Sequence, residues 1–200
     1  MYRIFVINPG STSTKVALFE DAANVWEKKI FHDSGELAGF GSVNDQLDYR
    51  YDIICRTLEE DGIDLEGIDA IACRGGSSCT VRSGVYRVDE KLIEDTRNAA
   101  GGAEHASMLG VQLGEMFRRR FGGQLFTRDP IVVDEYSDLA RMTGIKGLYR
   151  SLSSHALNQK AVARRYASET GRRYEDMDLI VAHIDGGITI AAHRHGRMTD

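Results

Sequence analysis

The fold is decided by the opening stretch Ile4-Phe5-Val6-Ile7-Asn8-Pro9-Gly10-Ser11-Thr12-Ser13-Thr14-Lys15-Val16-Ala17-Leu18-Phe19. Two apolar runs flank a polar turn, a pattern that predicts two strands joined by a tight hairpin. Backbone N–H groups in such a turn lie outside the strand ladder, and together with the hydroxyl groups they suit an anion such as phosphate. The pattern of a Walker P-loop is absent, and an ordinary edge hairpin with a polar tip is the alternative.

The candidate phosphate ligands are therefore the residues of this turn: Gly10, Ser11, Thr12, Ser13 and Thr14. Lys15 follows the turn and adds a positive charge. Asn8 precedes it and offers an amide that can hold a substrate oxygen or a metal-bound water.

A similar pattern returns near the end of the sequence. Residues 179–182 are apolar, the turn His183-Ile184-Asp185-Gly186-Gly187 follows, and residues 188–192 are apolar again. A recurring supersecondary unit indicates internal duplication. Two such hairpins facing each other across a cleft can bind a polyphosphate from both sides, as in the duplicated actin-like ATPases. We therefore expect an α/β fold of the ribonuclease H-like, actin-like ATPase type, with a mixed β-sheet flanked by helices.

Six blocks spread over the whole sequence resemble the butyrate kinases, which transfer a phosphoryl group between ATP and a short aliphatic carboxylate. These blocks are residues 7–15, 74–76, 104–107, 129–135, 155–163 and 178–200. The resemblance implies a carboxylate kinase of the acetokinase family that uses ATP or ADP and Mg²⁺. It also implies a short-chain carboxylate or acyl phosphate as substrate and assembly into a homo-oligomer.

The sequence departs from the family pattern at three places. Asp185 stands at a position of the second hairpin where butyrate kinases usually have glycine, so it either repels the nucleotide or holds its metal. The small polar residues 77–80 replace an apolar stretch, and Ser154 replaces a phenylalanine. Family members are also much longer. Residues 1–177 are expected to form the first actin-like domain, and residues 178–200 the first hairpin of a second, nucleotide-binding domain.

Further candidates follow predicted strands. A short strand over residues 69–73 runs into Arg74, whose planar guanidinium matches a carboxylate or phosphoryl group with two parallel hydrogen bonds. Residues 131–133 predict a buried strand that ends at Asp134, a carboxylate suited to orienting hydrated Mg²⁺. A helix-capping role is the alternative for Asp134. The metal candidates are thus Asp134 and Asn8.

Two predicted helix starts supply the other catalytic candidates. A helix expected over residues 104–120 has His105 in its first turn, where a histidine can donate a hydrogen bond to a substrate carboxylate or phosphoryl oxygen; capping or packing is the alternative. A helix expected over residues 156–170 follows His155, and we favour His155 and Asn158 as ligands of the phosphoryl oxygens. The resemblance assigns His183, Asp185, Gly186 and Gly187 to the nucleotide phosphates.

The remaining pattern predicts a strand over residues 24–31, a helix over 43–60 that stops at Gly62, an edge strand over 85–88 and a helix over 90–98 capped by Asp89. Arg118, Arg119 and Arg120 are expected to form a solvated helix end. His193 and His195 are expected to be exposed.

The composition and charge of the chain limit the classes of partner that it can bind. A formal charge of -5 disfavours nucleic acid or an anionic membrane as partner. No apolar run approaches the ~20 residues that cross a bilayer, and the N-terminus lacks the pattern of a secretion signal. The three cysteines form no C-x-x-C pair, so we expect a cytoplasmic protein.

The expected reaction is direct in-line transfer of the γ-phosphoryl group to butyrate or a branched-chain acid, because a carboxylate is already a competent nucleophile at neutral pH. Transfer to acetate or propionate is one alternative. A truncated, non-catalytic ligand-binding half is the other.

Overall fold

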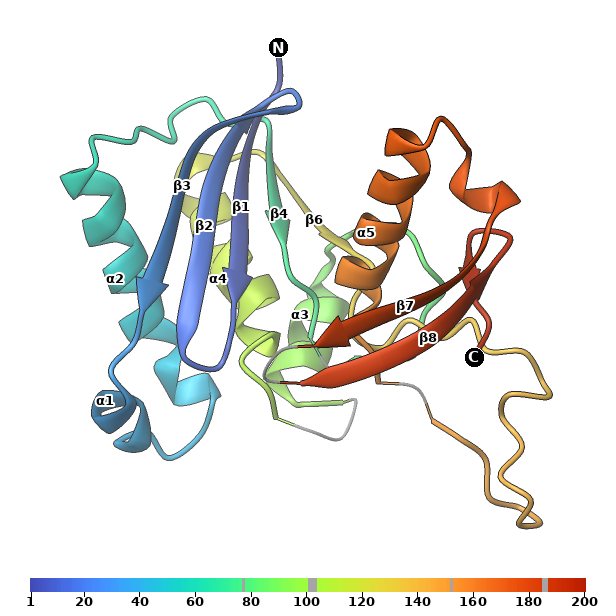
Figure 1. Cartoon of the computed structure of the whole chain (residues 1–200). Helices are drawn as coiled ribbons and strands as arrows, with labels where there is room; N and C mark the ends of the chain where they lie inside the picture. Colours follow the sequence, from blue (N-terminus) through green and yellow to red (C-terminus); the bar gives the residue numbers. More distant parts are fainter. Residues whose placement is uncertain (77, 101–103, 152, 185–186) are drawn as a thin grey trace. The chain divides into compact units, whose positions relative to one another are not determined.

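The computed structural model describes residues 1–76, 78–100, 104–151, 153–184 and 187–200 (Figure 1). The chain divides into two compact units. Unit 1 comprises Met1–Cys79 and Val85–Arg128, and unit 2 comprises Thr80–Gly84 and Asp129–Asp200. The prediction that residues 1–177 form one domain and residues 178–200 begin another stays a prediction.

Unit 1 is built on a six-stranded mixed sheet with the strand order β3-β2-β1-β4-β6-β5. β1 pairs with β4, and β4 with β6, in parallel, whereas β2, β3 and β5 run antiparallel to their neighbours. The strands are β1 (Arg3–Pro9), β2 (Ser13–Glu20), β3 (Ala23–Phe31), β4 (Ala70–Cys73), β5 (Val85–Arg87) and β6 (Gln124–Arg128). The helices are α1 (Ser34–Ala38), the 3₁₀ turn η1 (Asn44–Gln46), α2 (Leu47–Glu60), α3 (Glu90–Arg97) and α4 (Met108–Phe121).

The core of unit 1 lies between this sheet and the helices α2 and α4 (Figure 1). Alternate residues of β1 point the same way, so Phe5 and Ile7 are both fully buried. They pack in one cluster with Ile54 of α2 and with Leu109 and Leu113 of α4. This core fixes the carboxyl ends of β1 and β4, where Asn8 and Arg74 lie.

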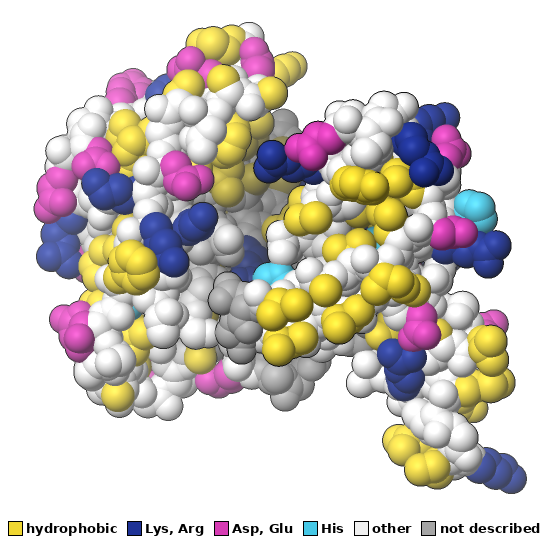
Figure 2. Space-filling view, viewed as in Figure 1, with side chains coloured by type: hydrophobic (Ala, Val, Ile, Leu, Met, Phe, Trp, Pro, Cys, Tyr) yellow, Lys and Arg dark blue, Asp and Glu magenta, His cyan; other side chains and the backbone are white. Residues whose placement is uncertain are grey.

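Unit 2 contains an antiparallel sheet of β7 (Asp178–Ile184), β8 (Ile188–Arg194) and β9 (Arg197–Met198), with α5 (Ala156–Glu169) and the 3₁₀ turn η2 (Tyr174–Asp176). Ala163 and Ala167 of α5 pack against Val181 of β7. The other face of the hairpin is exposed, and Figure 2 shows hydrophobic side chains gathered there. These side chains are Ile180, Ile184, Ile188 and Ile190.

Most sequence-based elements are confirmed. Both hairpins, the strands at 24–31, 69–73 and 85–88, the cap by Asp89 and the stop at Gly62, which has a φ of 66°, are present. Arg118, Arg119 and Arg120 form the exposed last turn of α4, where Arg118 and Arg119 pair with Glu115. No helix among the described residues is long and apolar enough to span a bilayer.

Three elements differ from expectation. The helix expected over residues 43–60 is divided into the turn η1 and the helix α2, which begins at Leu47. Residues 131–133 do not form a strand, because only Val133 makes an isolated bridge, to Val81. Asp129 has a φ of 42° and Pro130 lacks an N–H group, and both features interrupt strand pairing. The strand that precedes this segment is β6, which was not predicted from the sequence. In addition, α4 begins at Met108 rather than at residue 104, so His105 precedes the helix.

Candidate functional site

The first predicted phosphate turn joins β1 to β2 in unit 1. Strand pairing runs as far as Pro9 and Thr14, and Gly10 N donates a 2.7 Å hydrogen bond to Ser13 O across the turn. The side chains of Ser11 and Thr12 are exposed, whereas Thr14 is fully buried. Lys15 is exposed and lies 4.0 Å from the Glu27 carboxylate. The turn therefore presents hydroxyl groups to solvent and directs the Thr14 hydroxyl inward.

Arg50 of α2 is fully buried beneath this turn. Its guanidinium donates to the carbonyl oxygens of Gly10 at 2.9 Å and Ser11 at 3.2 Å, and to Thr14 Oγ1 at 3.0 Å. The Gln46 Oε1 atom accepts from Arg50 Nη2 at 2.9 Å. All these acceptors are neutral. Burial lowers the pKa of Arg50 to about 10, so the side chain stays charged at neutral pH.

Arg50 was not predicted as a functional residue, although the sequence carries a signal for it. Arg50, Ile54 and Leu58 follow one another at a spacing of four residues, and all three are buried residues of α2. An arginine in phase with an apolar helix stripe indicates a buried cation that needs partners.

Asn8 and Arg74 lie side by side at the carboxyl ends of the parallel strands β1 and β4. Arg74 N donates a 3.0 Å hydrogen bond to Ile7 O, which continues the pairing of the two strands. Burial lowers the pKa of Arg74, and among the described residues of unit 1 no carboxylate pairs with it. The Asn8 Oδ1 atom is buried and, within the described part of the chain, has no hydrogen-bond partner. Ligands commonly gather at such strand ends.

His105 lies near these residues, in the turn before α4. Its Nδ1 atom accepts a 3.1 Å hydrogen bond from Ser107 N and lies 2.9 Å from Ser107 Oγ. A ring that accepts a backbone N–H competes with helical hydrogen bonding, which explains the late start of α4. Burial, followed by the positive charges of Arg74 and Arg50, lowers the pKa of His105. The neutral ring therefore carries its proton at Nε2, as a hydrogen-bond donor.

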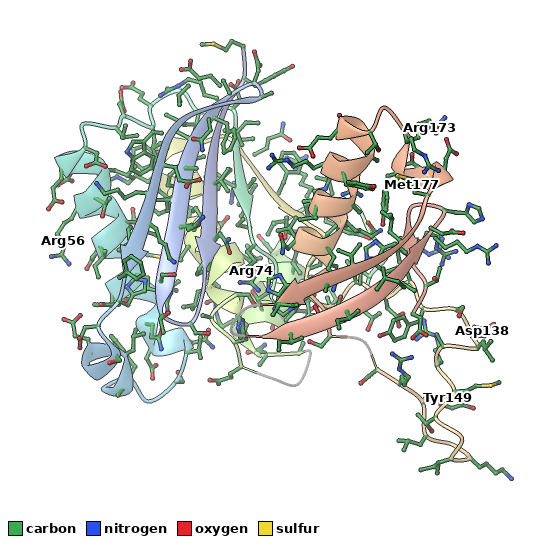
Figure 3. All side chains as sticks on the ribbon, viewed as in Figure 1. Arg56, Arg74, Asp138, Tyr149, Arg173 and Met177 are labelled. Carbon is green, nitrogen blue, oxygen red and sulfur yellow. The ribbon has the colours of Figure 1, made fainter. Side chains whose placement is uncertain are left out.

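Glycines let the start of α4 approach Arg74 closely. A Cβ built on Gly76 would lie 2.6 Å from Met108 N, and one on Gly110 would overlap the Arg74 carbonyl oxygen. The glycines of the Arg74-Gly75-Gly76 segment thus serve packing as well as ligand access. Figure 3 shows Arg74 near α4, and it shows Arg56 on the outer side of α2.

Asp134 lies in unit 2, where its backbone N–H donates to Val81 O at 2.9 Å. Its carboxylate accepts two hydrogen bonds from Arg141, at 2.6 and 2.8 Å, and one from Tyr136 N at 3.1 Å. The hydrogen bonds from Arg141 lower the pKa of Asp134. A metal ion at Asp134 would have to displace Arg141.

Three predicted ligands of unit 2 form one cluster. The rings of His155 and His183 stack with centroids 3.8 Å apart and an interplanar angle of 13°. Asn158 Nδ2 lies 2.6 Å from His183 Nδ1. A Cβ built on Gly187 would lie 3.2 Å from His155 Nε2, so the turn passes close to the ring. The predicted ligands Asp185 and Gly186 lie outside the described residues.

One prediction about histidines is wrong. His193 is 1% exposed, whereas His195 is exposed as expected. The strand alternation of β8 places His193 on the same inward face as Ala191, which the sequence analysis overlooked. On α5, Gln159 and Lys160 are buried, while Val162 is 50% exposed.

The described residues contain no group of three or more histidine, cysteine or acidic side chains that could hold a metal ion. The donors predicted for Mg²⁺ are found in separate units, Asn8 in unit 1 and Asp134 in unit 2. Of the two, Asn8 fits a hard ion or its bound water better, because its amide oxygen has no hydrogen-bond partner among the described residues.

Comparison with known proteins gives a consistent result. No protein-family model matches the sequence. Butyrate kinase 2 of Clostridium acetobutylicum is 41% identical over 199 residues, and probable butyrate kinase 2 of Caldanaerobacter subterraneus subsp. tengcongensis is 44% identical over 200 residues. Each alignment covers 100% of this chain and 56% of the relative. The chain thus spans about half the length of the curated relatives it matches.

Solved structures show the fold. The acetate kinase of Porphyromonas gingivalis superposes with a TM-score of 0.70 at 17% identity, over 100% of this chain and 57% of that one. A propionate kinase of Francisella tularensis superposes with a TM-score of 0.62 at 19% identity. The superposition covers 100% of this chain and 56% of the propionate kinase. The predicted actin-like ATPase fold is confirmed. Along its whole length, this chain is a homologue of the butyrate kinases with the fold of the acetate kinases.

Proposed function

We propose that this chain provides the acyl-substrate side of a butyrate kinase-like phosphotransferase. The reaction is reversible phosphoryl transfer between ATP and a short-chain carboxylate, butyrate or a branched-chain acid, with an acyl phosphate and ADP as products. The observation that carries the proposal is Arg74, a half-buried guanidinium with no carboxylate partner in the described part of unit 1, beside the unpaired Oδ1 of Asn8. A buried cation of this kind favours an anionic ligand.

In this proposal, different residues of unit 1 bind different parts of the reactants. Arg74 holds the carboxylate or the phosphoryl group, and His105 donates a hydrogen bond through Nε2. The turn of residues 10–14, through the exposed hydroxyl groups of Ser11 and Thr12, holds the phosphates together with Lys15. Because a carboxylate needs no deprotonation before it attacks, these groups orient the reactants and stabilise charge.

Unit 2 supplies further ligands in this proposal. His155 and Asn158 stabilise charge on the phosphoryl oxygens, and His183 with residues 185–187 contacts the nucleotide phosphates. Residues 178–200 are the first hairpin of the nucleotide-binding domain. The candidate Mg²⁺ ligands of the two units are Asn8 and, where Arg141 is displaced, Asp134; the ion would neutralise phosphate charge. We also propose a cytoplasmic protein that self-associates and binds neither nucleic acid nor membrane. The exposed isoleucines of β7 and β8 support self-association.

A calorimetric titration of the 200-residue chain with butyryl phosphate tests the anion site. We expect measurable binding that Arg74→Ala weakens by tenfold or more, since the variant loses a charged, bidentate contact. Arg56→Ala is the matched control, because Arg56 is an exposed arginine on α2 (Figure 3). Equal affinities of Arg74→Ala and the unmodified chain would remove Arg74 from the site.

A shorter acid is the second candidate substrate. The small polar residues Ser78, Cys79 and Thr80, which follow the Arg74-Gly75-Gly76 segment, favour it. Hydroxamate formation from ATP with acetate, propionate and butyrate ranks the acids directly. Butyryl phosphate binding without any acyl phosphate formation would instead favour a ligand-binding half.

A further inference from the structure

A buried row of polar side chains in unit 2 leads to His155. Tyr174 Oη lies 2.6 Å from His193 Nδ1, and His193 Nε2 lies 3.0 Å from Gln159 Oε1. Gln159 Nε2 lies 2.9 Å from Thr189 Oγ1, and Thr189 Oγ1 lies 2.9 Å from His155 Nδ1. Gln159 is fully buried, and Tyr174 and His193 are nearly so. The row joins η2, β8 and α5.

The direction of donation at Gln159 follows from one fixed acceptor. Gln159 Nε2 also lies 3.2 Å from the backbone oxygen of Thr189, which can only accept. The amide nitrogen therefore faces Thr189, and Oε1 faces His193. Because Oε1 accepts, His193 donates through Nε2–H, and its Nδ1 accepts from the Tyr174 hydroxyl.

The protonation state of His193 agrees with this direction. Burial, followed by the positive charge of Lys160, lowers the pKa of His193 to about 4, while Glu135 raises it and Arg164 lowers it further. The ring is therefore neutral at neutral pH. A neutral imidazole has one donor and one acceptor nitrogen, and the structure supplies one partner for each.

The direction continues to His155. Thr189 Oγ1 accepts from Gln159, so its own hydrogen is left to donate. His155 Nδ1 is the remaining partner, because within the described part of the chain no other acceptor lies within hydrogen-bond distance of Thr189 Oγ1. Donors aligned in one direction also polarise one another and strengthen each bond.

We propose that Tyr174, His193, Gln159 and Thr189 form a one-directional hydrogen-bond chain that holds His155 as the tautomer protonated at Nε2. These four are positioning residues. They make Nε2–H, the ring edge next to Gly187, the donating group of His155. The catalytic use of that donor rests on the proposed function, whereas the tautomer does not.

The tautomers can be measured without any variant. Long-range ¹H–¹⁵N correlation spectra of the ¹⁵N-labelled chain at pH 7.5 distinguish the two ring nitrogens of each histidine, and the exposed His195 serves as a reference. We expect His155 and His193 to carry the proton at Nε2. Protonation of His155 at Nδ1 would overturn the proposal, whether or not the protein transfers phosphoryl groups.

A matched pair of variants then tests the role of the Thr189 hydroxyl. Thr189→Val keeps the shape of the side chain but removes the donor, so the pKa of His155 should rise by on the order of one unit, because a bond that favours the neutral ring is lost. Thr189→Ser keeps the hydroxyl and should leave that pKa unchanged. His183 stacks on the ring and is present in both variants. Equal pKa values of His155 in the two variants would contradict the proposal.

Discussion

Arg50 Nη1 donates a 2.9 Å hydrogen bond to the carbonyl oxygen of Gly10, so a buried cation of α2 holds the first residue of the β1–β2 turn. The same guanidinium reaches Ser11 and Thr14. The geometry of the turn therefore depends on a helix distant in sequence, and not on the turn residues alone. A positive charge directly beneath the turn also favours an anion above it.

Replacing Arg50 should disorder the turn. Arg50→Met removes the donors to two carbonyl groups, one hydroxyl and one amide, so we expect a loss of about 2–4 kcal/mol in the free energy of unfolding. Hydrogen exchange of the Gly10 amide, which bonds to Ser13 O, should accelerate. Urea unfolding and exchange measured by NMR check both effects. Arg56→Met, an exposed change on the same helix, should stay within about 0.5 kcal/mol. Unchanged protection of Gly10 would refute this role.

The buried ion pair of unit 2 should behave differently from its exposed pairs. Lys160 Nζ and Glu135 Oε2 are 2.6 Å apart and almost inaccessible to solvent. Lys160→Met leaves Glu135 charged and buried, at an expected cost of about 3–5 kcal/mol. Adding Glu135→Gln should restore part of the loss, because the remaining amide oxygen still accepts from Met198 N.

A double-mutant cycle by urea unfolding measures the coupling between Lys160 and Glu135. The control cycle uses Arg165 and Glu169, an exposed pair at 2.8 Å, for which we expect at most about 0.5 kcal/mol. Similar coupling energies in both cycles would mean that burial does not strengthen the pair.

Two buried histidines should make the protein sensitive to mild acid. Burial, followed by the charge of Arg50, lowers the pKa of His32 from 6.5 to about 4, and the pKa of His193 is lowered equally far. Between these values the unfolded chain binds more protons than the folded chain, so the free energy of unfolding falls as the pH drops from 6.5 to 4. Each histidine contributes up to about 3 kcal/mol, since one pKa unit corresponds to about 1.4 kcal/mol.

Urea unfolding at intervals between pH 7 and 4.5 measures this loss. Asp129, Asp134 and Glu115 have lowered pKa values in the folded chain, so their own loss begins only near the acid end of this window, where the unfolded carboxylates bind protons. His105, whose pKa is also lowered, adds to the loss within the window. His32→Gln and His193→Gln should each flatten the curve, and His195→Gln, an exposed change, should not. A steep curve in the double variant of His32 and His193 would assign the acid sensitivity to other groups.

Local sequence pattern predicted most of the elements, because strand alternation and turn residues act over a few positions. The hairpin at residues 4–19 is an example: its two apolar runs and Gly10 define it without help from the rest of the chain. Residues 131–133 have the same apolar character, but within the described part of the chain their strand pairing is limited to the single bridge between Val133 and Val81. Pairing partners are a tertiary property, so this segment could not be distinguished from a strand by pattern alone.

The candidate site was predictable only where a residue follows a glycine turn or a strand end, as Arg74 does. Arg50 and His193 were not predicted as buried polar residues, because their roles depend on partners from distant segments. Arg50 bonds to the turn of residues 10–14. His193 bonds to Tyr174 and Gln159. Both nevertheless occupy inward positions of an apolar pattern. A polar residue in such a position is the sequence signal to search for.

Asp134 provides the sharpest test of metal binding. Its carboxylate is held by two hydrogen bonds from Arg141, so Arg141 competes with any cation for the same oxygens. Arg141→Met should therefore strengthen binding of Mn²⁺, used as a spectroscopic substitute for Mg²⁺, and Asp134→Asn should weaken it. Titrations of Mn²⁺ followed by electron paramagnetic resonance measure both. Arg165→Met, which frees the exposed carboxylate of Glu169, controls for the change in net charge. If Arg141→Met and Arg165→Met raise the Mn²⁺ affinity equally, the gain comes from charge alone and Asp134 is not a metal ligand.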